Sequence, residues 1–138
     1  MRTFTLREAQ SMLPILESLL RKSIEAKSMV EEVDQEFAEL SERIFVNGGM
    51  LIDLRHCQTR KAQREKALQS AKDTLSEINA IGVQVKDLDI GLLDFPCWVN
   101  GEIVLLCWRL GEPTITHWHS TEEGYAGRKP IEDMGSME

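Results

Sequence analysis

Apolar residues spaced alternately three and four apart over residues 16–44 constrain the fold of this chain more than any other feature. Such spacing places side chains in one narrow stripe along a helix, which is typical of the seam between two packed helices. The nine positions, all apolar except Ser23, are Leu16, Leu19, Ser23, Ala26, Val30, Val33, Phe37, Leu40 and Ile44. The pattern predicts a long helix over about 13–46 with one apolar face.

A short helix is expected before the long one. Thr5 followed three residues later by Glu8 fits a capping box, in which each side chain satisfies a free amide of the first helical turn. Pro14 interrupts a continuous helix but is tolerated in the first turn of a new one. The predicted short helix therefore covers about 5–12.

A second long helix is expected to fold back on the first. Asn-Gly-Gly at 47–49 stops the first helix, because these residues adopt the left-handed conformation of a helix end, and Gly82 stops the second. The second helix is predicted over about 49–81, antiparallel to the first because the connection is short. Its weaker stripe comprises Leu54, Cys57, Lys61, Arg64, Leu68, Ala71, Leu75 and Ile78. Residues 1–82 are thus predicted to form a coiled-coil hairpin.

Opposite charges face each other in this hairpin. Folding back near residue 48 sets the segment 31–42, which holds six acidic residues, beside 54–66, which holds five basic ones. We interpret the basic run as a partner for the acidic helix rather than as a nucleic-acid surface. Residues 83–138 hold four basic and ten acidic side chains, which repel phosphate. No nucleic-acid partner is expected.

Residues 83–138 are expected to form a small antiparallel β-sheet of about three strands, packed on the hairpin as one α+β domain. Asn100-Gly101 lies between two apolar runs and is the strongest short hairpin signal, a two-residue type I′ turn. With this turn Val99 pairs with Glu102. The segment TITHWHS is predicted to add a further strand.

This register assigns side chains to the two faces of the predicted hairpin. Cys97 and Cys107 fall on opposite faces, so they cannot form a disulfide with each other. Asp94 and Arg109 fall on one face at a diagonal, which predicts an ion pair.

With three cysteines and no CxxC pair, a reduced cytoplasmic protein is expected. No membrane association is expected, because the longest apolar stretch is broken by polar residues.

The HxH pair of the last predicted strand is the best candidate for a metal site. His117 and His119 fall on one face and Trp118 on the other, and Asp94 or Glu112 is able to complete a ligand set for a divalent metal. The alternative is that His119 is hydrogen-bonded inside the fold and His117 faces solvent. Cys107, between large apolar neighbours, is interpreted as an inert buried thiol.

The residues able to do chemistry gather in this C-terminal part. A small-ligand pocket, with hydrolysis as one of its possible activities, would use Asp94, Trp108, Arg109, Glu112, His119, Tyr125 and Arg128. The competing interpretation is that these residues form a structural core. The chain contains no nucleophile elbow, phosphate-binding loop, dinucleotide fingerprint or HExxH. No catalytic residue and no cofactor are therefore assigned.

A narrow seam on two helices buries little apolar surface, and apolar side chains also lie off the seam. We therefore expect a homodimer, with two hairpins forming four helices over part of their length. The first function hypothesis is a non-catalytic interaction protein that presents this hairpin, with a further protein partner possible. The second is the ligand or metal site around His119, Glu112 and Arg128.

Five blocks of the sequence, FTLREAQSMLPIL, KDLDIGLLDFP, CWRLGEP, WH and GYAGRKP, resemble the prokaryotic family catalogued as domain of unknown function 2203. The resemblance covers nearly the whole chain in order. It implies a helical hairpin joined to a small β region, and it implies no activity. The chain departs from the family pattern at His117, because that pattern asks only for Trp-His. The pattern falls on Asp89, Gly91, Asp94, Phe95, Pro96, Trp108, Gly111, Glu112, Trp118, His119, Gly124, Gly127 and Arg128.

Overall fold

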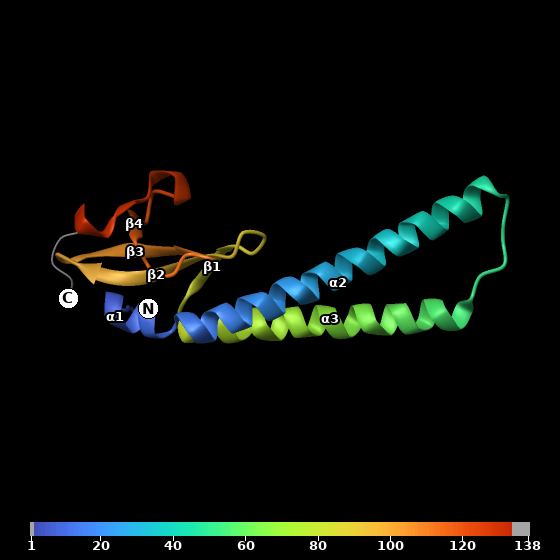
Figure 1. Cartoon of the computed structure of the whole chain (residues 1–138), viewed down its shortest axis with the longest axis horizontal. Coiled ribbons are helices and arrows are strands. Elements are labelled where there is room, and N and C mark those ends of the chain that lie inside the picture. The colour runs from blue at the N-terminus through green and yellow to red at the C-terminus, as the bar shows by residue number, and fades with distance from the viewer. Residues whose placement is uncertain (1, 134–138) are drawn as a thin grey trace.

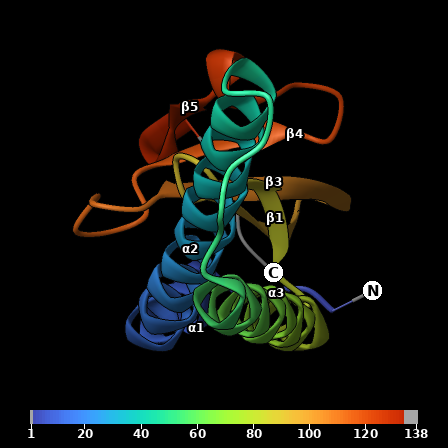
Figure 2. The ribbon, with the colours of Figure 1, turned by 90° about the vertical axis from the view of Figure 1, so that its right-hand side faces the viewer.

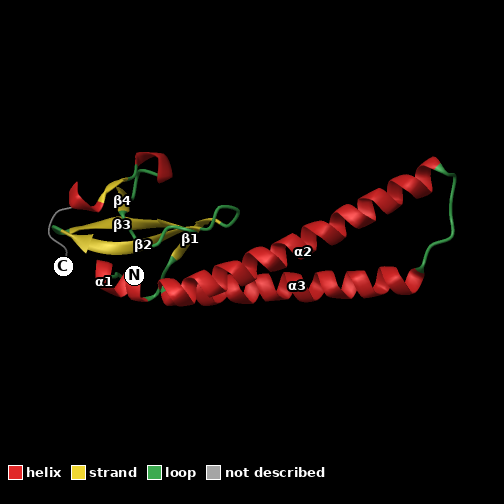
Figure 3. Ribbon diagram, in the orientation of Figure 1, coloured by secondary structure: helices red, strands yellow, loops and turns green. Residues whose placement is uncertain are grey.

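A computed structural model describes residues 2–133 of the chain. Two long helices project from one side of a small sheet, and the molecule is elongated as a result (Figure 1). Helices and strands occupy separate parts of the structure (Figure 3), which makes the fold α+β as predicted. The elements are α1 (Leu6–Ser11), α2 (Leu13–Val46), α3 (Leu54–Ile81), β1 (Gln84–Asp87), β2 (Leu92–Val99), β3 (Glu102–Arg109), β4 (His117–Ser120), β5 (Lys129–Pro130) and the 3-10 turns η1 (Tyr125–Gly127) and η2 (Ile131–Asp133).

The break between α1 and α2 lies where the sequence predicts it. The Thr5 hydroxyl accepts a hydrogen bond from the Glu8 amide at 3.1 Å, and the Glu8 carboxylate accepts one from the Thr5 amide at 3.2 Å. This capping box starts α1, and Pro14 lies in the first turn of α2. Both helix starts therefore follow from local side-chain chemistry.

The second long helix starts later than predicted. The Asp53 carboxylate accepts a hydrogen bond from the His56 amide at 3.0 Å, so Asp53 is the N-cap and α3 begins at Leu54 rather than near residue 49. A side-chain acceptor at this position satisfies an amide that has no partner within the helix. Residues 47–53 consequently form a longer connection than Asn-Gly-Gly alone.

α2 and α3 pack closely only near the sheet. The buried residues of α2 end at Val33, and those of α3 begin at Ala71. Further out the helices diverge, as Figures 1 and 2 both show, and the predicted seam residues Phe37, Leu40 and Ile44 are only half-buried. The seam therefore works as an intramolecular interface over its first half.

The ion pairs between the helices follow the predicted alignment. Arg60 pairs with Glu36 at 2.9 Å, and Arg64 pairs with Asp34 at 2.7 Å. His56 also contacts Glu36 at 2.7 Å. These contacts are partly exposed to solvent, so they select the register of the helices more than they stabilise the fold.

The sheet is a meander with strand order β1-β2-β3-β4-β5, all neighbours antiparallel. The predicted β2–β3 register is confirmed, since Val99 pairs with Glu102 and the pairing continues to Leu92 and Arg109. Asn100 and Gly101 have φ values of 50° and 79°, as a type I′ turn requires. Five strands are present instead of about three, because β1 and the short β5 extend the sheet at its edges.

The two faces of the sheet are covered by different parts of the chain. One face packs on α1 and the first half of α2, in a core that contains Phe4, Leu16, Leu20, Phe95 and Trp108. The C-terminal segment after β4 lies on the side away from the helices (Figures 1 and 2). Residues of the β2–β3 hairpin are therefore buried on both faces, as their apolar character predicts.

No helix in the described part of the chain is both long enough and apolar enough to cross a membrane.

Candidate functional site

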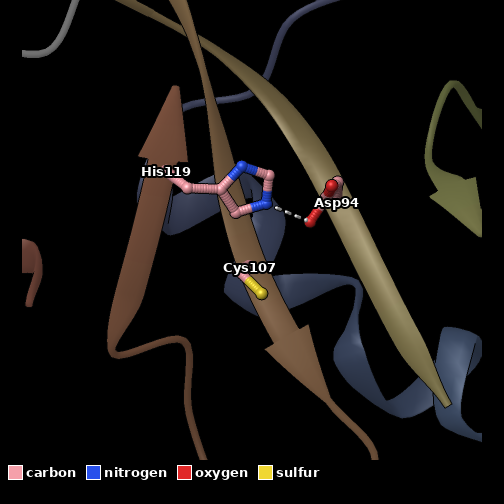
Figure 4. Close-up of side chains that lie close together, drawn as sticks. All are labelled: Asp94, Cys107 and His119. Atoms are coloured by element: carbon pink, nitrogen blue, oxygen red, sulfur yellow. Dashed lines mark hydrogen bonds and ion pairs between the residues drawn. The ribbon is translucent and has the colours of Figure 1, made fainter. Parts of the chain in front are cut away.

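A buried polar cluster lies on the sheet face away from the helices. Asp94 comes from β2, Cys107 from β3 and His119 from β4, and the three side chains converge (Figure 4). The sheet register explains the convergence, since Asp94 pairs with Cys107, and His119 pairs with the residue two positions before Cys107. Their exposed fractions are 1%, 0% and 2%, so the cluster is closed to bulk solvent.

The hydrogen bonds of His119 determine how many protons the Asp94–His119 pair holds. The Nδ1 atom lies 2.8 Å from the Ser120 carbonyl, which only accepts, so Nδ1 carries a proton. The Nε2 atom lies 3.0 Å from Asp94 Oδ1, and this contact needs a second proton on one of the two atoms. The pair is therefore neutral overall, as an ion pair or as a carboxylic acid beside a neutral imidazole.

The second carboxylate oxygen of Asp94 has no hydrogen-bond partner, although it is buried. Cys107 lies close enough to influence the charge of Asp94, but its geometry does not satisfy this oxygen. Burial raises the pKa of Asp94, and the nearby His119 opposes that rise. Burial, together with the charge of Asp94, raises the pKa of the Cys107 thiol to about 11. The thiol is therefore protonated at neutral pH.

An ion pair lies beside this cluster. The Arg128 guanidinium donates to both carboxylate oxygens of Glu112, at 3.1 and 3.3 Å. Glu112 also accepts from the Arg109 amide at 2.7 Å, and its carbonyl accepts from the Trp108 indole at 2.9 Å. Glu112 thus connects the β3–β4 turn to the C-terminal segment.

Arg128 makes two further contacts. Its guanidinium carbon lies 4.4 Å from the centre of the Tyr125 ring, a cation–π arrangement. The guanidinium also lies next to the Cys107 thiol, whose pKa it lowers against the larger effect of burial. The guanidinium of Arg128 is therefore already paired with the Glu112 carboxylate and packed against the Tyr125 ring.

The structure brings together most of the predicted pocket residues. Asp94 and His119 form one pair, and Glu112, Arg128 and Tyr125 form the neighbouring group. Trp108 connects to this group through Glu112 and is otherwise part of the core facing the helices.

The expected ion pair between Asp94 and Arg109 is wrong. Arg109 does not pair with Asp94, because Asp94 is buried against His119, whereas Arg109 is exposed and is hydrogen-bonded to Glu112 through its backbone amide and carbonyl. His117 does not join His119 in one cluster, although both pair with residues of the same β3 face. The His117 ring is instead hydrogen-bonded to the Thr116 hydroxyl at 2.8 Å.

Sequence reasoning missed Cys107 as a member of the cluster. Its apolar neighbours indicated an inert buried thiol, and Cys107 is buried as expected. The predicted register nevertheless places Cys107 directly opposite Asp94, and this was the signal available.

A separate cleft of about 360 Å³ lies where the β3–β4 turn meets the start of α2. Of the predicted pocket residues, Trp108 and Glu112 contribute to it. Asp94, His119 and Arg128 do not line it, so the cleft and the polar cluster are distinct features. The cleft is lined by Gln10, Leu13, Pro14, Glu17, Trp108, Gly111, Glu112 and Pro113.

Fold and site together define an α+β protein with a projecting helical hairpin and a five-stranded meander that encloses a buried polar cluster. Residues 2–131 match the family described as an uncharacterized conserved protein (DUF2203). The chain belongs to this family, which the sequence blocks also indicated. No curated protein and no solved structure matches the chain.

Proposed function

We propose that this protein is a non-catalytic interaction protein of the cytoplasm, and that it forms a homodimer through the outer half of its helical hairpin. The observation that carries the proposal is a group of six exposed large apolar side chains at the end of the hairpin, which we call the apolar tip. It consists of Phe45, Val46, Met50, Leu51, Ile52 and Leu54.

The exposure of these side chains is unusual for a monomer. Leu51 is 98% exposed and Phe45 is 86% exposed. Scattered apolar residues are common on protein surfaces, but a contiguous group indicates a surface that is covered by a partner. The apolar tip continues the stripe formed by Phe37, Leu40 and Ile44, which are half-buried between the diverging helices. A partner that covers the tip would therefore also cover this part of the stripe.

Charge distribution favours a second copy as the partner. Within the described chain, Glu39 and Glu42 on α2 and Arg55, Lys61 and Lys66 on α3 form no ion pair. A two-fold axis that sets α2 of one copy against α3 of the other brings acids to bases twice, since the same contacts repeat on both sides. The hairpin surface is thus complementary to itself.

A cytoplasmic location is supported by the cysteines. Cys57, Cys97 and Cys107 are all free thiols, and the two buried ones lie on opposite sheet faces. Reduced thiols persist in a reducing compartment.

The small-ligand hypothesis receives less support from the geometry. Glu112 and Arg128 neutralise each other, Tyr125 stacks on Arg128, and His119 is enclosed. A ligand at these residues would have to displace existing ion pairs before binding.

Light scattering coupled to size exclusion tests the dimer. We expect a mass twice the 15.7 kDa of the chain at micromolar concentration. A Phe45→Asp/Leu51→Asp variant should be monomeric, because it places charge in the dimer interface. Ile15→Asp is the matched control, since Ile15 is 58% exposed on α2 but lies at the sheet end, and this variant should remain dimeric.

Charge exchange distinguishes the proposed two-fold arrangement from other modes of association. Glu39→Lys/Glu42→Lys should weaken the dimer, and adding Arg55→Glu/Lys61→Glu to the same chain should restore it. A wild-type protein that stays folded and monomeric at micromolar concentration contradicts the proposal, and the apolar tip would then belong to a contact with another protein.

A further inference from the structure

We propose that Asp94, Cys107 and His119 form a binding site for one divalent transition-metal ion of the zinc class. The inference goes beyond self-association and does not depend on it, because the cluster lies in the sheet rather than in the hairpin. A carboxylate oxygen, a thiolate sulfur and an imidazole nitrogen are donor types that proteins use for zinc.

The backbone already places the three donors together. Their ligand atoms all lie within 4.8 Å of one another, and each comes from a different, directly neighbouring strand. Figure 4 shows the three side chains directed toward a common region on one face of the sheet. A ligand set carried by paired strands is held more precisely than one carried by loops.

Independent support comes from the unpartnered oxygen of Asp94. This atom is buried and accepts no hydrogen bond, whereas buried polar atoms in proteins nearly always have a partner. The hydrogen bond to His119 satisfies only the other oxygen. A cation bound at the cluster supplies the missing interaction.

The surroundings of His119 match those of a metal ligand. Its Nδ1 atom donates to the Ser120 carbonyl, which orients the ring and leaves Nε2 facing Asp94 and Cys107. Metal-binding histidines commonly donate their second ring nitrogen to a backbone carbonyl or a carboxylate in this way.

Charge also balances when the ion binds. Without metal, the hydrogen bonds of His119 require one proton between Nε2 and the Asp94 carboxylate, and Cys107 is a free thiol. A divalent ion replaces these two protons, which leave to solvent, and the bound state contains a carboxylate, a thiolate and a neutral imidazole. The buried net charge is zero before and after the exchange.

The neighbouring ion pair permits this exchange. Arg128 lies beside the Cys107 thiol, but Glu112 neutralises its charge, so a cation at the cluster meets no net repulsion from the pair.

Cobalt substitution provides the direct test. Full-length protein is purified without a metal-binding tag, treated with a chelator and titrated with Co²⁺. We expect one ion per chain and a thiolate-to-cobalt charge-transfer absorption, and mass spectrometry of untreated protein should find about one zinc per chain. Wild-type protein that is folded by circular dichroism, yet shows neither the absorption nor stoichiometric metal, overturns the proposal.

Cysteine variants identify which sulfur atom binds the cobalt ion. Cys57→Ser/Cys97→Ala leaves Cys107 as the sole thiol, and the absorption should persist at full strength. Cys107→Ser and Asp94→Asn should each weaken Co²⁺ binding by more than about 100-fold, since even outer-shell changes cost 10–100-fold. Because Cys97 is buried in the same hairpin on the opposite face, it is the matched control for Cys107.

The remaining outcomes also decide the question. An absorption that is lost in Cys57→Ser/Cys97→Ala but kept in Cys107→Ser assigns the metal elsewhere and contradicts the proposal. If Cys107→Ser or Asp94→Asn fails to fold, the double variant that keeps Cys107 still decides, because a thiolate band from that protein arises only from Cys107.

Discussion

The imidazole of His119 on β4 is hydrogen-bonded to the carboxyl group of Asp94 on β2 at 3.0 Å, across the intervening strand β3. The contact joins two strands that are not neighbours in the sheet, and it is almost completely buried. Because β4 has only four residues, this contact adds to the attachment that its pairing with β3 provides. In the metal-free protein the pair therefore holds the C-terminal segment onto the sheet.

We predict that Asp94→Ala lowers the free energy of unfolding by about 3 kcal/mol, because it leaves the enclosed His119 Nε2 without a partner. Asp94→Asn should cost about half as much, since the amide still donates to a neutral imidazole. Urea denaturation of metal-free protein measures both values. Equal costs for the two variants would contradict this prediction, because they would show that the amide, which keeps the volume of the carboxyl group, does not replace its hydrogen bond.

Ser23 and Thr74 form a buried hydrogen bond between α2 and α3, and the two residues should respond differently to substitution. The Thr74 hydroxyl already donates to the Ser70 carbonyl at 2.9 Å, so Ser23 is the donor in the pair. Thr74→Val removes the acceptor of a buried donor and should cost about 1–2 kcal/mol. Ser23→Ala leaves Thr74 satisfied and should change the unfolding free energy by less than about 0.5 kcal/mol. The opposite order in thermal or urea unfolding would refute the assigned direction of donation.

The Glu112–Arg128 pair should show measurable coupling. Both side chains are mostly shielded, and the contact is bidentate, so a double-mutant cycle with Glu112→Gln and Arg128→Gln should give about 1 kcal/mol. Arg128→Lys should not restore the full value, because a lysine cannot donate to both oxygens in the same geometry. Additive effects of the two substitutions would mean that the pair contributes nothing to stability.

Glu123 should make stability depend on pH in the acid range. Hydrogen bonds from Lys129 at 2.8 Å and from the Ser120 amide at 3.2 Å lower the pKa of Glu123 from 4.5 to about 2. Because the folded-state pKa is below the unfolded value, the stabilisation is complete above about pH 4.5 and is lost as pH falls toward 2. The difference in unfolding free energy between wild type and Glu123→Gln should shrink over this window. A difference that is constant with pH would contradict the lowered pKa.

Substitutions at the apolar tip should separate association from folding. Leu51→Asn removes a side chain that is almost fully exposed, so the unfolding free energy of the monomer should change by less than about 0.5 kcal/mol. If dimerisation buries the tip, the same variant should shift the dimer dissociation constant upward and lower the melting temperature only at high protein concentration. A concentration-independent loss of stability would indicate that Leu51 belongs to the monomer core.

Much of the fold follows from short-range chemistry that can be read along the chain. The capping box of Thr5 and Glu8, the first-turn Pro14 and the type I′ turn at Asn100-Gly101 are decided by residues close in sequence. The spacing of apolar residues in α2 and the fold-back near residue 48 then aligned Arg60 with Glu36. The late start of α3 was missed although Asp53 carries its own capping signal.

The sequence by itself also determined which residues gather in the C-terminal part, because the register of one hairpin assigns every side chain to a face. Only the tertiary structure decided their partners. The sequence offered both Arg109 and His119 as partners for Asp94. The pairing of β4 with β3 places His119 in the buried position beside Asp94, whereas Arg109 remains exposed to solvent. Burial and strand order depend on packing between segments that are distant in sequence. The divergence of α2 and α3 toward the apolar tip depends on the same packing, and the uniform spacing of apolar residues in α2 does not reveal it.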